Sequence, residues 1–148
     1  MNKLRRTKAF TLIELLVVVA IIGILAAVGV VAYNGYTASA KANSTKTMHS
    51  NAVKYISAEI QKCSLGESKF MGTNQDCPAT AAKAVSGAVA TMTDKNPYNT
   101  SEPAVKEAGG FVAGQVSLSS SGSTITVKTC TKSGCGSSDQ LTATISVD

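Results

Sequence analysis

The sequence predicts an α+β fold in which a long N-terminal helix, part membrane span and part amphipathic, packs on a small C-terminal antiparallel sheet. Three observations predict it. Residues 15–32 form an apolar run of 18 residues. Apolar residues continue at helical spacing from there to about residue 63. After Gly110 the apolar residues alternate with small polar ones, which is the period of a strand. The 148 residues are enough for one ordinary domain.

Basic residues are concentrated before the apolar run. The net charge of +5 is, by itself, typical of a nucleic-acid-binding protein. However, Lys3, Arg5, Arg6 and Lys8 supply four of the 14 basic residues, and the charges of the remaining chain nearly balance. We therefore interpret residues 1–9 as a basic leader peptide and expect no specific nucleic-acid site.

Residues 10–40 contain a single charged side chain, that of Glu14. A helix made of residues 15–32 is about 27 Å long, close to the thickness of the hydrocarbon core of a bilayer. Because Lys and Arg precede this run, the N-terminus is expected to stay in the cytoplasm and the following domain to lie outside. The sequence therefore predicts one membrane span, followed by a globular domain over residues 41–148.

The helical pattern continues beyond the apolar run. One face of the predicted helix has members three and four residues apart: Met48, Ala52, Tyr55, Ile56, Glu59, Ile60 and Cys63. No proline occurs before Pro78. We therefore expect one continuous helix of roughly 50 residues from Phe10 to Cys63.

The second half of the chain is expected to hold the sheet. Residues 64–110 contain loop signals and one Ala-rich piece, 79–90, that predicts a short helix. Residues 112–118, 124–130 and 141–147 alternate and predict three antiparallel strands, the first two joined by a turn at 119–122. A sheet of three such strands can bury its apolar face only if another element packs against that face. The outer half of the long helix is expected to be this element.

Four cysteines are typical of two disulfides in an exported domain. Three connectivities are possible, and we prefer the local pairs Cys63–Cys77 and Cys130–Cys135. Zinc is disfavoured because no two cysteines have CxxC spacing and the chain has a single histidine, His49. Residues 93–99 contain oxygen ligands for calcium but no regular ligand spacing, so a turn is the preferred interpretation. We expect no metal and no cofactor.

The segment 5–33, RRTKAFTLIELLVVVAIIGILAAVGVVAY, resembles the N-terminal signature of type IV pilins and of the pseudopilins of type II secretion. The resemblance implies a pilin lollipop, a long helix carrying a globular head. It also implies that a prepilin peptidase cuts between Ala9 and Phe10 and methylates the new amine of Phe10, and that Glu14 serves assembly. Two residues depart from the pattern. Ala9 stands where glycine is usual, and Val31 stands where many pilins have a kinking proline.

The same resemblance implies a function. The chain would be the major structural subunit of a surface pilus, held as a single-pass prepilin in the inner membrane and extracellular after assembly. Its partners would be copies of itself, the prepilin peptidase, and an inner-membrane assembly platform with its motor ATPase. Alternatives are a pseudopilin of a secretion piston or a minor or competence pilin.

The residues also bear on two further classes of function. An exported binding domain with an ordinary signal peptide is the first, because Ala38-Ser39-Ala40 fits the small-residue pattern of a cleavage site. An enzyme is the second. With one histidine and no glycine-rich phosphate loop, the sequence contains no catalytic constellation, so we expect the chain not to be an enzyme.

Overall fold

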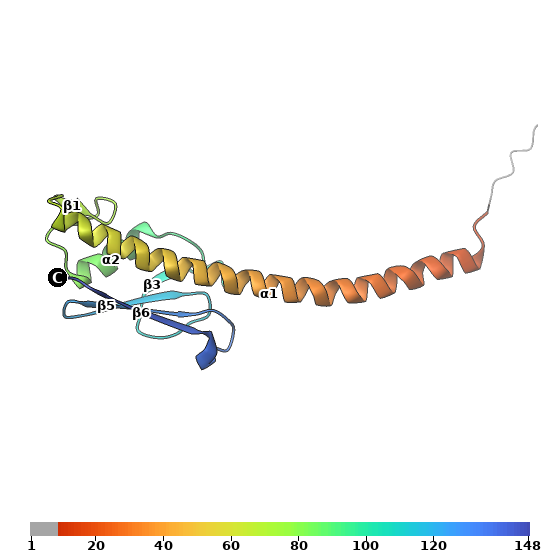
Figure 1. Cartoon of the computed structure of the whole chain (residues 1–148). Coiled ribbons are helices and arrows are strands. Elements are labelled where there is room, and N and C mark those ends of the chain that lie inside the picture. The colour runs from red at the N-terminus through yellow and green to blue at the C-terminus, as the bar shows by residue number, and fades with distance from the viewer. Residues whose placement is uncertain (1–8) are drawn as a thin grey trace, which may run out of the picture. The chain divides into compact units, whose positions relative to one another are not determined.

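The structure is a computed structural model that describes residues 9–148. Most of the predicted leader, residues 1–8, lies outside the described residues. In chain order the elements are α1 (Leu12–Ser64), β1 (Lys69–Phe70), β2 (Gln75–Asp76), α2 (Ala81–Thr91), β3 (Val105–Glu107), β4 (Val116–Ser121), β5 (Thr124–Cys130), the 3-10 turn η1 (Ser137–Asp139) and β6 (Gln140–Ser146) (Figure 1). The chain divides into two units, Met1–Thr37 and Ala38–Asp148.

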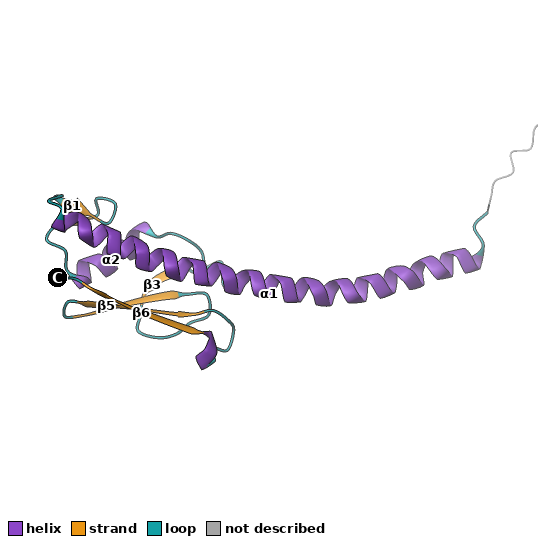
Figure 2. Cartoon of the chain, in the orientation of Figure 1, coloured by secondary structure: helices purple, strands orange, loops and turns teal. Residues whose placement is uncertain are grey.

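Helix α1 is continuous over 53 residues, which confirms the expected long helix (Figure 2). Within the second unit it buries one face, whose members lie three and four residues apart: Ala42, Thr45, Met48, Ala52, Ile56, Glu59 and Ile60. The side chains of Ala52 and Ile56 are completely buried. This face packs against the sheet and α2 and forms the helical side of the core, as the amphipathic pattern predicts.

The main sheet has the strand order β3-β4-β5-β6. Strands β4, β5 and β6 are antiparallel neighbours, as predicted, but β3 pairs parallel with β4, so the sheet is mixed. Val105 of β3 lies opposite Val116 of β4. The eight-residue loop 108–115 returns the chain to the same end of the sheet. The prediction of loop structure around residues 105–107 was therefore wrong, because these residues form β3.

Strand β4 begins at Val116 rather than at residue 112. Just before the strand, Gly114 has a φ of +72° and interrupts the extended chain. The strand also runs further than predicted, and Ser121 pairs with Thr124. The hairpin turn is therefore Gly122-Ser123 instead of 119–122. Gly122 has a φ of +58°, as expected for glycine at the first position of a two-residue hairpin turn.

Alternation along the strands separates two faces of the sheet. The inner face contains Val116, Leu118, Ile125, Val127 and Ile145, all buried in the core. Helix α2 covers part of this core, and Thr80 caps it by accepting a hydrogen bond from Lys83 N at 3.3 Å. The outer face consists mostly of Ser and Thr residues, together with Lys106, Lys128, Cys130 and Gln140. A thin apolar core of this kind needs the long helix as its cover.

Candidate functional site

The predicted processing and assembly residues lie at the start of α1. Ala9, Phe10 and Thr11 precede the first helical residue, Leu12, and the side chain of Phe10 is 85% exposed. Thr11 N donates a hydrogen bond to Glu14 Oε2 at 2.8 Å, and Glu14 N donates to Thr11 Oγ1 at 3.3 Å. This reciprocal pair is a capping box, which satisfies two backbone donors at a helix N-terminus.

The capping box is a feature that the sequence analysis missed. Its signal was present, because threonine followed three residues later by glutamate, just before an apolar run, is the sequence signature of the motif. From the sequence, Glu14 was expected only to serve assembly. The geometry gives its carboxylate a second task, which is to define where the helix begins.

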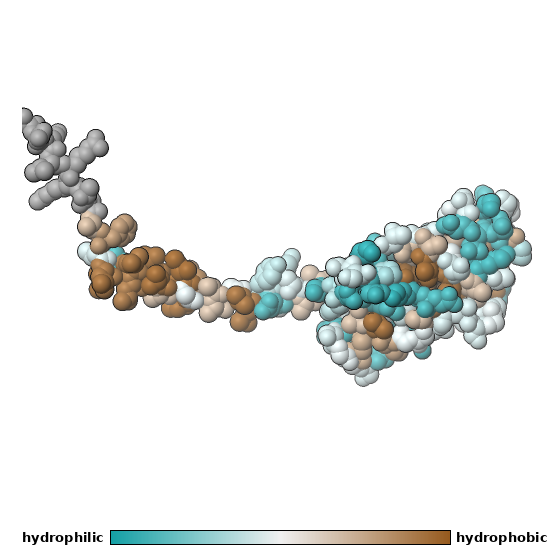
Figure 3. All heavy atoms as spheres, turned by 180° about the vertical axis from the view of Figure 1, so that it is seen from behind, coloured by the Kyte–Doolittle hydropathy of each residue, from teal (hydrophilic) through white to brown (hydrophobic). Residues whose placement is uncertain are grey.

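The helical part of the first unit exposes its apolar side chains on every side. None of the 18 residues of its most apolar window is buried within the structure, and the helix is long and apolar enough to cross a membrane. Leu12 is 82% exposed and Val31 is 74% exposed. Figure 3 shows this surface in brown. An apolar surface of this extent requires a cover of lipid or protein.

Three glycines of α1 have no packing role in the described chain. A Cβ added at Gly23, Gly29 or Gly35 would meet nothing within 4 Å. Glycine costs roughly 1 kcal/mol relative to alanine inside a helix. Small residues allow close approach between helices in an apolar environment, so these positions suit contacts with other helices.

The second unit holds the two disulfides. Cys63 is joined to Cys77, with their Cα atoms 5.5 Å apart, and Cys130 is joined to Cys135, with a Cα separation of 5.4 Å. These are the two local pairs that the sequence analysis preferred. The first links the last turn of α1 to the loop before α2, and the second closes a short loop between β5 and β6.

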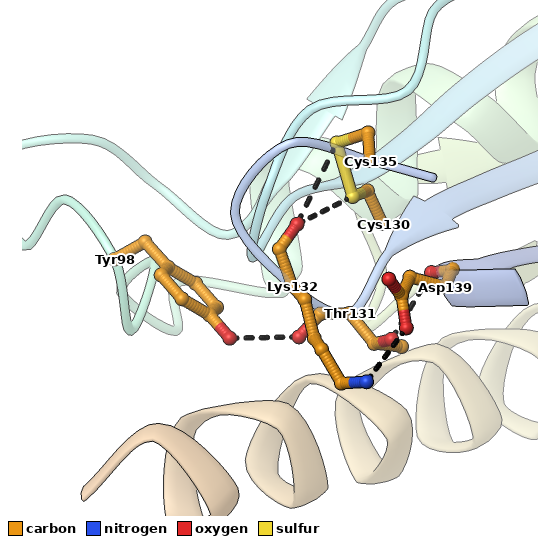
Figure 4. A network of polar contacts seen from close by, with 6 residues as sticks. All are labelled: Tyr98, Cys130, Thr131, Lys132, Cys135 and Asp139. Carbon is orange, nitrogen blue, oxygen red and sulfur yellow. Dashed lines mark hydrogen bonds and ion pairs between the residues drawn. A yellow bond between two sulfur atoms is a disulfide. The ribbon is translucent and has the colours of Figure 1, made fainter. Parts of the chain in front are cut away.

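Polar contacts fix the small disulfide loop (Figure 4). The hydroxyl of Tyr98 donates to Thr131 O at 2.7 Å, and burial raises the pKa of Tyr98, which keeps that hydroxyl protonated. Thr131 N donates to Asp139 O at 2.8 Å, and Lys132 Nζ pairs with Asp139 Oδ1 at 2.9 Å. Every one of these contacts holds the shape of the loop.

Glu59 is a buried acid that the sequence analysis placed on the helix stripe without a role. It is 6% exposed and accepts hydrogen bonds from Lys62 Nζ at 2.5 Å and Gly72 N at 3.3 Å. Burial raises the pKa of Glu59, but the hydrogen bonds from Lys62 and Gly72 and the charge of Lys62 outweigh it, so the pKa is lower than usual. Glu59 thereby holds the turn 71–73, in which all three residues have positive φ.

The segment considered for calcium and the single histidine both make contacts that stabilise the fold. Asn96, in the segment considered for calcium, is buried and uses its side-chain amide to accept from Tyr98 N at 2.8 Å and to donate to Ala113 O at 2.9 Å. His49 Nδ1 lies 2.9 Å from Thr129 Oγ1, across the contact between α1 and β5. Over residues 9–148, no group of three or more His, Cys, Asp or Glu side chains is placed to hold a metal ion.

Comparisons with known proteins agree with the geometry at the start of α1. Residues 4–30 match the family described as the prokaryotic N-terminal methylation motif. The "Fimbrial protein" of Moraxella nonliquefaciens is 35% identical over 92 residues, which are 61% of this chain and 56% of that protein. The "Type IV major pilin protein PilE1" of Neisseria gonorrhoeae is 61% identical over 41 residues, 28% of this chain and 24% of that protein.

The match therefore spans just over half of one relative and about a quarter of the other. No solved structure matches significantly. The family match covers the segment that contains the start of the exposed apolar helix, the Thr11–Glu14 capping box and the predicted cleavage position. By this motif and these relatives, the N-terminal segment of the chain is similar to that of type IV pilins.

Proposed function

We propose that the chain is the major structural subunit of a type IV pilus-like surface filament. The observation that carries this proposal is the apolar half of α1, which nothing in residues 9–148 covers. As a prepilin the helix would be covered by the inner membrane, and in a filament by the helices of other copies. Both environments are apolar, so the hydrophobic effect contributes little to the free energy of assembly.

Processing would separate the leader, residues 1–9, from the rest by cleavage between Ala9 and Phe10, with methylation of the new amine of Phe10 by a prepilin peptidase. The exposed, non-helical segment before Leu12 supports access of a protease to this bond. The capping box survives such a cut, because Thr11 and Glu14 both remain in the mature chain. Residues 10–40 would then be the assembly half and residues 41–148 the exported domain.

Glu14 would give the assembly its axial register. A carboxylate at the centre of a membrane helix costs roughly 2.5–3.5 kcal/mol on insertion scales. The capping hydrogen bond and the positive end of the helix dipole reduce that cost in the single chain. In a filament the methylated amine of Phe10 of another copy would neutralise the carboxylate. An assembly platform and its motor ATPase would extract the subunit from the inner membrane.

The relatives' names favour a pilin over a pseudopilin, since the relatives are called fimbrial protein and type IV major pilin protein. We infer a structural rather than an enzymatic role for this chain on the same ground. The alternative with an ordinary signal peptide would require cleavage after Ala40. Residues 38–40 lie inside the continuous helix α1, which disfavours that alternative.

The first test is an intact mass and N-terminal sequence of the protein taken from cells, combined with the yield of filaments sheared from their surface. The proposal expects a chain that begins at methylated Phe10 and is abundant in the sheared fraction. A mature chain in trace amounts there would indicate a minor pilin or pseudopilin. A chain beginning at Lys41 would overturn the proposal, because the assembly helix would be absent.

A further inference from the structure

Strand β6 forms one edge of the main sheet, and its outer backbone groups are unpaired. Val147 N donates to Ser123 O at 2.8 Å, which makes Val147 and Ser123 a hydrogen-bonded pair in the β5–β6 register. Because such pairs alternate along an antiparallel ladder, the odd-numbered residues of β6 bond to β5. The N–H and C=O groups of the even-numbered residues, Gln140 to Ser146, therefore point away from the sheet. Among residues 9–148, no contact outside the ladder satisfies the backbone of Thr142 or Thr144.

This edge has none of the usual protection. Exposed edge strands are normally short, charged, bulged or interrupted by proline, because an open edge pairs with other strands. Strand β6 has the sequence QLTATIS, seven residues without charge or proline. The opposite edge provides the contrast. Strand β3 has three residues, two of them Lys106 and Glu107, and Lys106 is ion-paired with Glu102.

The side chains next to the open edge are also neutral. On the outer face of the sheet, Thr142 and Thr144 are exposed beside Thr126 of β5. On the inner face, Leu141 and Ala143 are only half-buried, because no strand lies beyond them. A further strand would cover both of these apolar side chains and extend the row of threonines. Thr–Thr pairs across neighbouring strands are stabilising.

We propose that β6 pairs antiparallel with β6 of a second copy of this chain, with Ala143 opposite Ala143. In this register Thr142 faces Thr144 and Gln140 faces Ser146, so all four outward-pointing residues of each strand are used, in about eight hydrogen bonds. No like charges meet along the contact. At its ends, Asp148 of each copy lies opposite Ser138 of the other, one residue before Asp139, whose carboxylate is paired with Lys132 at 2.9 Å.

The symmetry of this contact determines what it joins. A two-fold contact uses the same surface on both partners and closes on itself, so it cannot propagate a filament. It therefore acts between copies in two neighbouring filaments and holds them side by side. This step rests on the proposed function, since it requires filaments to exist.

A single introduced cysteine tests the register. The variant Ala143→Cys places two thiols in a non-hydrogen-bonded pair, where Cα atoms are about 4.5 Å apart, within the range for a disulfide. The native cysteines are all in disulfides, so the new thiol is the free one. In the matched control Ser146→Cys the two thiols are about 20 Å apart in this register. Sheared filaments of both variants are treated with a mild oxidant and run on non-reducing gels.

The expected result is a covalent dimer for most of the Ala143→Cys subunits and monomer for Ser146→Cys. Filaments of both variants without a dimer in Ala143→Cys, or with equal dimer in both, would overturn the pairing. Absence of filaments from the unaltered protein would instead refute the proposed function.

A second pair of variants tests the contact should Ala143→Cys fail to fold. Thr144→Pro removes an outward N–H that no bond inside the chain uses, and an edge strand tolerates proline at such a position. Thr144→Val keeps the backbone donor and the β-branched shape. We expect electron micrographs to show bundled filaments for Thr144→Val and separate filaments of normal length for Thr144→Pro. Equal bundling in both variants would refute the proposal.

Discussion

Thr11 and Glu14 cap each other at the first turn of α1, with Thr11 N 2.8 Å from Glu14 Oε2 and Glu14 N 3.3 Å from Thr11 Oγ1. The glutamate therefore contributes in two separable ways, as a hydrogen-bond acceptor that fixes the helix start and as a negative charge in an apolar helix. Glutamine at position 14 would keep the first contribution and remove the second, because it also supports a capping box but carries no charge.

The variants Glu14→Gln and Glu14→Ala distinguish the capping role of Glu14 from the role of its charge. Glutamine removes the charge alone, whereas alanine removes both the charge and the hydrogen-bond acceptor. We expect both variants to insert in the membrane and to be processed, and both to lower filament yield about ten-fold or more, because removing one partner of a buried ion pair costs several kcal/mol. The yield is measured by quantifying subunits in the sheared fraction against those in the membrane. A normal yield for Glu14→Gln together with a loss for Glu14→Ala would assign the effect to the cap and refute the charge pair.

Gly114→Ala should destabilise the second unit. Gly114 has a φ of +72°, and an added Cβ would lie 2.1 Å from Asn96 Oδ1. Backbone strain and overpacking together predict a loss of about 3 kcal/mol in the free energy of unfolding. Gly110→Ala is the matched control, because a Cβ there meets nothing within 4 Å. Denaturant unfolding of the full chains in detergent measures both, and equal stabilities would contradict the clash.

The free energy of unfolding should decrease as pH is lowered through the range where histidine titrates, because of His49. Burial lowers the pKa of His49 below its ordinary value of 6.5. The unfolded chain then binds a proton more readily than the folded one, so His49 disfavours folding progressively as pH drops below about 6.5 towards the folded pKa. Unfolding free energies at pH 8 and pH 5.5 should differ more for the unaltered chain than for His49→Gln. The same pH dependence in both would exclude His49 as its source.

Glu59→Gln should weaken the attachment of the turn 71–73. Because the pKa of Glu59 is lowered, the carboxylate contributes stability that is complete above about pH 4.5 and is lost as pH falls through the lower folded value. At pH 7 the substitution removes a charge-assisted bond to Lys62 and should cost about 1–3 kcal/mol. Glu67→Gln, at an exposed position, serves as control. A loss of equal size in the control would refute the role of Glu59.

The features that could be predicted from the sequence are those with a local period. The second half of α1 and strands β5 and β6 follow from spacing, because their apolar residues recur on one face, at the period of a helix or of a strand. The capping box could also have been predicted, because a threonine lies three residues before a glutamate. These features need only a few neighbouring residues to be recognised.

The features that were missed depend on contacts between distant residues. Strand β3 has three residues, too few for a period, and exists because Val105 pairs with Val116. The late start of β4 follows from the approach of Asn96 to Gly114, residues 18 apart that no local pattern connects. The partners of Glu59 in the turn 71–73 likewise come from folding of the loop that the Cys63–Cys77 disulfide closes.

The disulfide Cys63–Cys77 has a mechanical consequence. It binds the last turn of α1 covalently to the loop before α2. In the proposed filament, a pulling load on each subunit would enter residues 41–148 through α1. At the far end of that helix the load passes into a covalent cross-link and from there to α2, rather than into hydrogen bonds alone. The disulfide therefore keeps the end of the helix attached to the domain under load. Stretching would first break the non-covalent contacts between α1 and the sheet.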